Sequence, residues 1–428
     1  MNPISLLRRF RTFDSLIEVP AFRWYILSTA GEWSSLHMQG VVRGFLAYQI
    51  TGSFAALGVV ELGNTIPRMF LALFGGAVAD RASRRVIMQT TFVVNALSAA
   101  VLAAVVFAGQ LRIEHLVIGA FVQGVVNSFA LPARQAMIPE IVGNERMMNA
   151  FALNVFNLNV LRLVAPATAG GLIAAFGSGW VFVSIACLYV FASIAMFPIP
   201  VTTSATRAAQ ANGGAIDEEA PASSFREGIR DIVDGIRYVR ASHVLMVLLV
   251  VQLVGAILAF PYQRLLPGFV DVVLSGGDDD LTAILMGVLL GFTAAGALVG
   301  SLLIASMPSR NRGKLMIASF VVFGLALFAF SASSVFWLSA GVAVIVGIGQ
   351  SGRMSLLNVL VQSNTHEAYR GRVSAVLMLD DGLESLGVLG IAMLADLFGP
   401  QIALAGVGVG LVSLAGALWV TRVIRDMD

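Results

Sequence analysis

Ionisable side chains interrupt the long apolar stretches of this sequence, and charged groups in such places can pair with one another or carry protons. On insertion scales, a charged residue at the centre of a membrane-spanning helix costs about 2.5–3.5 kcal/mol. Because that cost must be offset, we expect a partner or water beside each of them. The candidates for intramembrane ion pairs or proton coupling are Glu32, Arg43, Glu61, Arg68, Arg162, Arg264, Asp380, Asp381 and Glu384.

Counting along the helices assigns four of these charges to two expected pairs. Arg43 precedes the turn near Gly52 by as many residues as Glu61 follows it. Since a helix rises about 1.5 Å per residue, both lie at one depth, and we predict an Arg43–Glu61 pair. Arg68 and Glu384 lie at similar depths from the other ends of their helices, which predicts an Arg68–Glu384 pair.

The composition indicates that these charges lie in a membrane. Of the 428 residues, 57% are hydrophobic and 12% are charged, whereas a soluble protein of this length carries roughly twice that charged fraction. The apolar residues fall in repeated runs of about 20 residues, the length that crosses a bilayer core. We therefore expect the lipid bilayer to be a partner of the chain.

Several classes of function find no support in the sequence. The net charge of +2 is too small to indicate nucleic-acid binding, and Cys187 is the single cysteine, so no intrachain disulfide can form. The sequence has no P-loop, HExxH, G-x-S-x-G or Cys/His metal-binding pattern. We expect neither an enzyme nor an ATP-driven pump, and no metal site or cofactor.

The apolar runs predict an all-α membrane protein with twelve transmembrane helices. Helices are expected because an open sheet edge in lipid would leave backbone groups unpaired. The expected limits of the helices are 23–49, 55–79, 86–109, 114–136, 148–175, 179–199, 243–270, 282–305, 313–331, 334–357, 371–396 and 400–422.

The basic residues predict the orientation of the chain. Most of the 27 lysines and arginines lie on the side of the N-terminus, while Arg112 lies in a loop on the other side. Because basic loops are retained in the cytoplasm, we expect both termini to be cytoplasmic.

The segment between the sixth and seventh predicted helices differs from both flanks. Residues 201–223 are small and polar, as in a flexible linker, and residues 224–240 have the pattern of an interfacial amphipathic helix. We expect an N-terminal six-helix half over residues 1–200, a cytoplasmic linker over 201–242 and a C-terminal six-helix half over 243–428.

The two halves resemble each other in sequence. "FGSGWVFVS" from Phe176 aligns with "FGPQIALAG" from Phe398, and "ARQAMIPEIV" from Ala133 aligns with "GRMSLLNVLV" from Gly352, at a nearly constant offset. These matches occur in order and in register, so they indicate a parallel duplication. Two six-helix halves related by an axis along the membrane normal describe the major facilitator fold.

The turn after the second predicted helix carries a recognisable motif. "GGAVADRASRR" resembles the loop signature of the major facilitator superfamily, G-x-L-A-D-R-x-G-R-[KR], through Gly76, Asp80, Arg81, Arg84 and Arg85, while Ser83 replaces the second glycine. The resemblance implies a conformational latch in which Asp80 caps the N-terminus of the eleventh helix, where a carboxylate is stabilised. The arginines could pair with Glu140 or Glu145, or could serve only to set the topology.

Other segments resemble a narrower bacterial branch of this superfamily, which includes the enterobactin exporter and macrolide efflux proteins. They are "FALPARQAMIPEIV", "NLNVLRLVAPATAGGLIAAFG", "FPYQRLLPGFVDVVL" and "YRGRVSAV". The resemblance covers nearly the whole chain and implies the inner membrane of a bacterial cell.

Two further signatures of the superfamily are present in part. Pro166 and Gly170 match the antiporter signature G-P-x-x-G-G, in which small residues also let helices approach closely. In the drug-antiporter pattern R-x-x-Q-G, Gln123 and Gly124 match but Ala120 replaces the arginine. A proton relay through that arginine is therefore not available.

In this fold, the first, fourth, seventh and tenth helices line a central cavity. For any single residue, a structural hydrogen bond is the commoner role, but together the polar residues of these helices describe a wet cavity with two fixed arginines. They are Glu32, His37, Arg43, Gln123, Asn127, Gln252, Gln263, Arg264 and Gln350.

The sequence favours a secondary transporter that exports a small amphipathic or anionic molecule, such as a siderophore-like compound, a drug or a metabolite. Rocking of the halves would expose the cavity to each side in turn. We expect protons to be the coupling ion, with Glu32, Glu61 and Glu384 as candidate carriers, and we expect a monomer. An importer or uniporter is the alternative within transport, and a lipid flippase or a membrane sensor is the alternative from another class.

Overall fold

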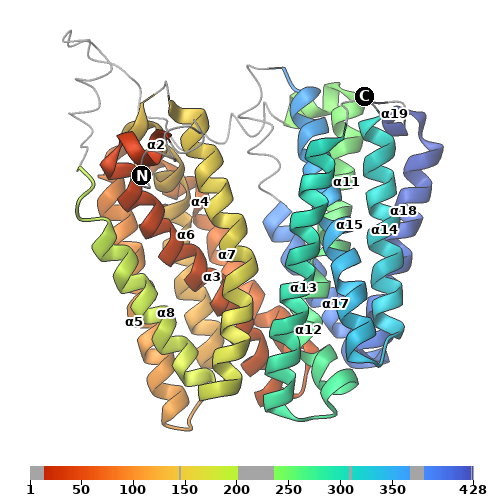
Figure 1. The fold of residues 1–428 in the computed structure, drawn as a ribbon, viewed down its shortest axis with the longest axis horizontal. Coiled ribbons are helices and arrows are strands. Elements are labelled where there is room, and N and C mark those ends of the chain that lie inside the picture. The colour runs from red at the N-terminus through yellow and green to blue at the C-terminus, as the bar shows by residue number, and fades with distance from the viewer. Residues whose placement is uncertain are drawn as a thin grey trace, which may run out of the picture.

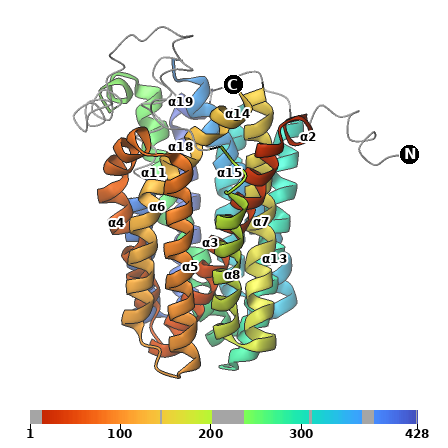
Figure 2. The same cartoon turned by 90° about the vertical axis from the view of Figure 1, so that its left-hand side faces the viewer.

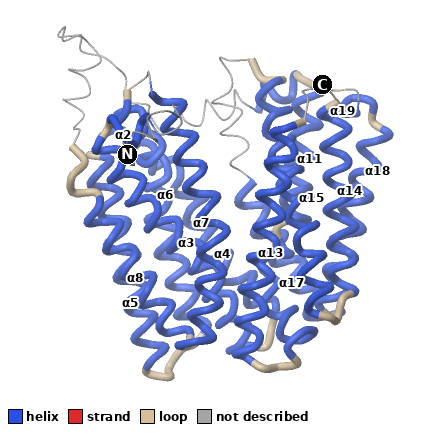
Figure 3. The backbone as a smooth tube through the Cα atoms, viewed as in Figure 1, coloured by secondary structure: helices blue, strands red, loops and turns tan. Residues whose placement is uncertain are grey.

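The described chain is helical, with short turns between the helices (Figure 3). The computed structural model describes residues 14–143, 146–200, 236–307, 311–366, 380–425 and 427. Residues 201–235, which contain the predicted linker and most of the predicted amphipathic helix, lie outside the described residues. Residues 236–241 are helical, as the amphipathic pattern predicts.

An N-terminal bundle contains the helices that precede residue 200. α4 and α6 pack at very short range because their contacts use glycine: a Cβ atom at Gly124 would lie 2.1 Å from the carbonyl oxygen of Asn64, and one at Gly75 would lie 2.1 Å from that of Ser128. The helices of this bundle are α2 (Asp14–Glu18), α3 (Pro20–Thr51), α4 (Phe54–Arg81), α5 (Arg84–Phe107), α6 (Ile113–Val142), α7 (Met147–Phe176) and α8 (Ser178–Ala195).

A C-terminal bundle contains the helices that follow residue 242. The predicted helix over 243–270 is divided there, because Pro261 has no N–H group with which to continue the hydrogen bonding of the preceding turn. The elements of this bundle are α11 (His243–Ala259), α12 (Pro261–Phe269), the π-helix η3 (Val270–Ser275), α13 (Asp279–Ser306), α14 (Arg312–Ala332), α15 (Phe336–Ser363), α17 (Asp380–Phe398), α18 (Pro400–Val420) and α19 (Arg422–Arg425).

Nine helical stretches of the described chain are long and apolar enough to cross a membrane. α3, α4 and α17 are not among them. α3 spans 32 residues, but polar side chains in its middle, such as Glu32, His37 and Gln39, lower its hydropathy. The all-helical membrane architecture is therefore confirmed, while composition alone does not recover the predicted count of twelve.

The two bundles converge at one end of the molecule and separate toward the other (Figure 1). The described chain begins at α2 and ends at α19 on the side where the bundles separate, which we call the terminal face (Figures 1 and 2). The other side, where the turn at Gly52 joins α3 to α4, is called the opposite face. The bundles touch through α4 against α17 and through α7 against α13.

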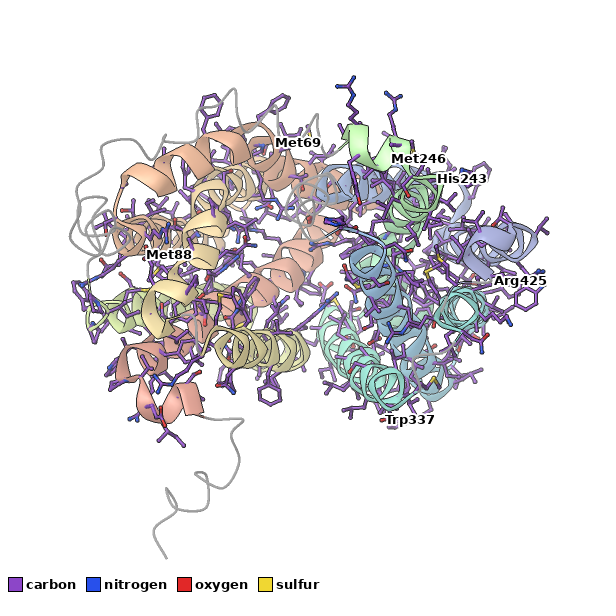
Figure 4. All side chains as sticks on the ribbon, turned by 90° about the horizontal axis from the view of Figure 1, so that it is seen from above. Met69, Met88, His243, Met246, Trp337 and Arg425 are labelled. Atoms are coloured by element: carbon purple, nitrogen blue, oxygen red, sulfur yellow. The ribbon has the colours of Figure 1, made fainter. Side chains whose placement is uncertain are left out.

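The perimeter of each bundle is apolar and exposed, as expected for a surface that faces lipid. Phe70 is 67% exposed and Trp337 is 74% exposed, and Trp337 projects from the rim of the C-terminal bundle in a view along the helices (Figure 4). Because water would disfavour so many exposed apolar side chains, their surroundings are best matched by acyl chains.

Candidate functional site

A cavity of about 730 Å³ lies between the two bundles. Residues of α3, α4, α6 and α7 line it from one side, and residues of α12, α13, α15 and α17 line it from the other. The predicted lining helices correspond to α3, α6, α12 and α15. The volume lies within the range of about 300–1,000 Å³ that is usual for small-molecule sites.

The cavity extends toward the terminal face. Its lining along α6 continues to Arg134 and its lining along α15 continues to Asn358, each in the direction of the terminal end of the helix. Hydrogen bonds between the bundles lie on the other side of the cavity: Gln49 Nε2 donates to Asp279 Oδ2 at 2.7 Å, on the opposite face. The structure is therefore open toward the terminal face and closed toward the opposite face.

Most of the polar residues singled out from the sequence line this cavity. Gln252 does not, because it lies on α11, and the break at Pro261 turns α12 rather than α11 toward the cavity. The predicted residues that line it are Glu32, His37, Arg43, Gln123, Asn127, Gln263, Arg264, Gln350, Glu61, Arg68, Arg162, Glu384 and Pro166.

Glu32 belongs to a buried ion pair that the sequence analysis did not anticipate. Arg134 Nη1 donates to Glu32 Oε1 at 2.6 Å, and the two side chains are only 10% and 3% exposed. The Arg134 guanidinium lies 4.3 Å from the ring centroid of Trp33, and the hydroxyl of Tyr25 donates to the backbone oxygen of Arg134 at 3.2 Å. α6 stays helical through Pro132 and extends beyond the expected end at residue 136, so Arg134 lies inside the bundle.

The predicted Arg43–Glu61 ion pair does not form as a hydrogen-bonded contact, although the two charges interact electrostatically. Arg43 donates to Gln123 Oε1 and to the carbonyl oxygen of Gly119, the latter at 3.1 Å. Glu61 pairs instead with Arg264 of the other bundle, at 3.0 Å. Equal depth fixes the height of a residue on its helix but not the direction in which its side chain points, and Arg43 faces α6.

Arg264 reaches Glu61 across α3. A Cβ atom at Gly40 would lie 3.1 Å from Arg264 Nη1, so the missing side chain at Gly40 leaves room for the guanidinium. His37 lies one helical turn before Gly40 and interacts electrostatically with both Arg162 and Arg264. The centre of the cavity therefore brings the arginines of α7 and α12 close to the imidazole of α3.

The predicted Arg68–Glu384 pair stays a prediction. Both residues line the cavity from the facing helices α4 and α17. Arg162 interacts electrostatically with Glu384 and with Arg264. The side chains of Asp380 and Asp381 lie outside the described residues.

The loop motif is described in part. Arg84 Nη1 donates to Glu140 Oε1 at 2.6 Å and to the carbonyl oxygen of Ala136 at 2.8 Å, as the predicted pairing with Glu140 requires. Arg85 donates instead to the carbonyl oxygen of Ile199 at 2.6 Å. The side chains of Asp80 and Arg81, and the surroundings of Gly76, lie outside the described residues, so the latch itself stays a prediction.

The antiporter-like motif lies at a contact between the bundles. A Cβ atom at Gly170 of α7 would lie 2.8 Å from the carbonyl oxygen of Ala283 and 2.8 Å from the Cα atom of Gly287, both on α13. Pro166, one turn earlier, lines the cavity. The glycine is therefore needed where the two halves cross.

Comparisons with known proteins identify the family of this chain. A family model described as "Transmembrane secretion effector" matches residues 15–428. The staphyloferrin A transporter of Staphylococcus aureus is 22% identical over 346 residues, which cover 80% of this chain and 81% of that protein. The multidrug efflux pump Tap of Mycolicibacterium fortuitum is 25% identical and covers 90% and 91%, and macrolide efflux protein A of Streptococcus pyogenes is 22% identical and covers 93% and 96%.

Solved structures share the fold at low sequence identity. The nucleoside transporter NupG superimposes with a TM-score of 0.71 at 13% identity, over 94% of this chain and 98% of that chain. A bacterial homologue of the human lysosomal transporter Spinster, in an inward-facing and unoccupied conformation, superimposes with a TM-score of 0.69 at 15% identity, over 95% and 98%. Since the family match spans almost the whole chain and every relative named is a transporter, this protein belongs to the transmembrane secretion effector family of major facilitator transporters and is not an enzyme.

Proposed function

We propose that this protein is a secondary transporter that exports a small anionic or amphipathic molecule by alternating access. The observation that carries the proposal is the charge of the central cavity. Five arginines and three glutamates line it, an excess of two positive charges among the described residues: Arg43, Arg68, Arg134, Arg162, Arg264, Glu32, Glu61 and Glu384. A cavity lined by one excess sign of charge concentrates ligands of the other sign.

The excess is unevenly distributed over the cavity. Glu32 neutralises Arg134 in the N-terminal bundle, and Glu61 neutralises Arg264 between the bundles. Arg43 donates to the neutral oxygens of Gln123 and Gly119, and its electrostatic partner Glu61 is hydrogen-bonded to Arg264, so one carboxylate is shared by two arginines. An anionic ligand near Arg43 and Arg162 would reduce the cost of keeping these cations within the membrane.

Export and orientation form part of the same proposal. The chain has twelve transmembrane helices in two six-helix halves, and its terminal face is cytoplasmic, with Arg84, Arg85 and Arg146 on that side. The cavity then opens to the cytoplasm, as an exporter requires when it collects its substrate. The relatives named as efflux pumps support this direction.

Proton coupling is proposed to act through the cavity glutamates. Protonation of Glu61 would remove the charge that holds Arg264 of the other bundle, and so would loosen the contact between the halves. Glu32 and Glu384 are the other candidate carriers. Protonation of Glu61 would then lengthen the distance between Glu61 Oε1 and Arg264 Nη2, which is 3.0 Å in this state, and so favour opening of the opposite face.

The test uses everted membrane vesicles, whose outer surface is the cytoplasmic one. The probes are 2-naphthalenesulfonate, 2-naphthalenesulfonamide and N-methylquinolinium, which have similar ring systems but fixed negative, neutral and positive forms, so a pH gradient does not redistribute the charged pair passively. With an acidic lumen, we expect the sulfonate to accumulate, a protonophore to abolish its accumulation, and the quinolinium ion to be excluded.

Two arginine variants provide the matched comparison. Arg162→Gln removes a cavity cation and should reduce sulfonate accumulation, whereas Arg146→Gln removes an arginine that pairs with Glu18 outside the cavity, at 2.5 Å, and should not. Equal accumulation of all three probes, or equal effects of the two variants, would show that the cavity charge does not select the substrate.

A further inference from the structure

The N-terminus of α4 is capped by a carboxylate of the other bundle. Asp396, in the last turn of α17, accepts hydrogen bonds from the hydroxyl of Ser53 at 2.7 Å and from the backbone N–H groups of Phe54 at 2.6 Å and of Ala55 at 2.9 Å. These three bonds lie on the opposite face and join residues far apart in the sequence. They were not predicted, because nothing in the local sequence of Asp396 indicates its partner.

Asp396 supplies the N-terminal cap that the N-cap residue of α4 does not provide. The first N–H groups of a helix have no acceptor within the helix, and an N-cap serine normally accepts one of them through its hydroxyl oxygen. Ser53 is the N-cap of α4 but makes no such bond; its hydroxyl donates to Asp396 instead. The carboxylate also meets the positive end of the dipole of a 28-residue helix.

This contact can exist only while the opposite face is closed. α4 and α17 belong to different bundles, and one turn deeper a Cβ atom at Gly58 would lie 2.7 Å from the Cα atom of Leu389. Because the helix backbones are in direct contact here, the three hydrogen bonds to Asp396 cannot be kept when the helices move apart. Separation of the bundles on that face therefore breaks all three. The freed N–H groups of α4 would then need water in place of the carboxylate.

We propose that Asp396 is a latch that holds the face opposite the termini closed and so sets the balance between the two states of the transporter. The proposal rests on the alternation assumed in the proposed function. The predicted latch residue Asp80 lies at the other end of the same helix pair, in the last turn of α4. If the predicted latch at Asp80 holds, each of these antiparallel helices presents an aspartate to the N-terminus of its partner, one at each face of the membrane.

The competing explanation is a cap that only stabilises the fold. Such a cap would contribute equally to both states, and its loss would lower stability without changing the population of either. Asp278 provides a control of this kind: it caps α13 within a single bundle, where its Oδ1 accepts from the N–H of Leu281 at 3.0 Å.

The experiment measures the two faces separately in the full-length protein. In a Cys187→Ser background, spin labels at Gln110 and Ser334 report the distance between the bundles at the opposite face, and labels at Pro200 and Ser363 report it at the terminal face. All four positions are exposed or at a helix end. Distance distributions by double electron–electron resonance are compared for the parent protein, Asp396→Asn, Asp396→Ala and Asp278→Asn in lipid nanodiscs.

We expect Asp396→Asn to lengthen the distance at the opposite face and shorten it at the terminal face, with about a fivefold or larger change in the ratio of the two populations. Asp396→Ala should give the larger change, because it removes the acceptors as well as the charge. Asp278→Asn should leave both distributions as in the parent protein.

Parent-like distributions in both Asp396 variants would overturn the latch, and so would the same shift in Asp278→Asn, which would indicate general loosening. Failure of the proposed function is distinguishable from these outcomes. In that case the vesicles accumulate none of the three probes, while Asp396→Asn still shifts the distances.

Discussion

Which two charged residues pair inside the membrane depends on the direction of their side chains as well as on their depth. Glu61 lies at the height of Arg43, but it pairs with Arg264 of the other bundle at 3.0 Å. Both members are partly exposed to the cavity, at 32% for Arg264 and 19% for Glu61. The pair therefore combines moderate strength with access for a proton, which suits a contact that must break in each cycle.

Removal of one member of this pair should weaken the contact between the bundles. Glu61→Gln leaves the charge of Arg264 without its partner, at a cost of about 1–3 kcal/mol. The cost is smaller than for a fully buried pair because water in the cavity screens the unpaired charge. We expect a lower thermal midpoint and loss of the dependence of transport on the pH gradient. A double variant with Arg264→Gln should recover part of the lost stability.

The matched control is Glu18→Gln, which breaks the exposed pair with Arg146, whose side chains are 51% and 40% exposed. It should leave the thermal midpoint and the transport rate close to those of the parent. If Glu61→Gln behaves like this control, the pair between the bundles has no role in stability or coupling.

The sequence identified most of the charged residues that line the cavity but not their partners. Charges inside apolar runs are visible in the sequence because they interrupt hydropathy, so Glu61, Arg162 and Arg264 were found. Arg134 also lies within an expected helix, 114–136, but near its end, and it was not among the charges singled out from the sequence. Which residue each charge meets depends on the rotation of helices packed against each other, and a single chain's periodicity does not determine that rotation.

The two ends of the α4–α17 pair are the elements at which the proposed latches act. The carboxylate of Asp396 holds one end in the present state, and Asp80 is predicted to hold the other end in the alternate state. Because the two contacts cannot both be made at once, each should oppose the other in setting the equilibrium.

Asp80→Asn should therefore shift the protein toward the state seen here, with the terminal face open, while Asp396→Asn shifts it away. The double variant should return the ratio of the two populations toward that of the parent, because both states lose a similar contact. The spin-label distances at the two faces measure this directly. Shifts of the two single variants in the same direction would refute the opposed arrangement.

The crossing of α7 and α13 should tolerate no side chain at Gly170. Gly170→Leu inserts atoms where a Cβ alone would lie 2.8 Å from the Ala283 oxygen. We expect a loss of about 1–3 kcal/mol in stability, as for other overpacked contacts, and a strong reduction in transport, measured by thermal unfolding and vesicle uptake. Gly171→Ala is the control, because nothing lies within 4 Å of a Cβ atom at Gly171; equal losses in both variants would argue against a specific crossing.

The helices themselves were largely predictable, and their exceptions have local causes. The expected limits of the fifth helix, 148–175, differ by one residue at each end from α7. The seventh differs because Pro261 interrupts it, and the proline was visible in the sequence but its consequence for Gln252 was not. Hydropathy fixes where a helix runs, whereas a break within an apolar run decides which part of it faces the cavity.

At the scale of the whole molecule, one cavity between two converging bundles explains the charged residues, the glycine contacts and the contacts of the opposite face together. The repeat in the sequence predicted two similar halves, but it did not predict which face would be closed. That choice depends on small differences between contacts such as those of Asp396 and Asp80, which compete at the two ends of the same helix pair.

The most direct test of alternating access is the accessibility of one cavity position from both sides of the membrane. Ala294, near the middle of α13, lines the cavity, and Ala294→Cys in a Cys187→Ser background can be labelled with a membrane-impermeant maleimide in right-side-out and in inside-out vesicles. We predict rapid labelling from the terminal face, slower labelling from the opposite face, and faster labelling from the opposite face when Asp396→Asn is added. Labelling from the terminal face alone, in both the parent and the Asp396→Asn protein, would contradict the account.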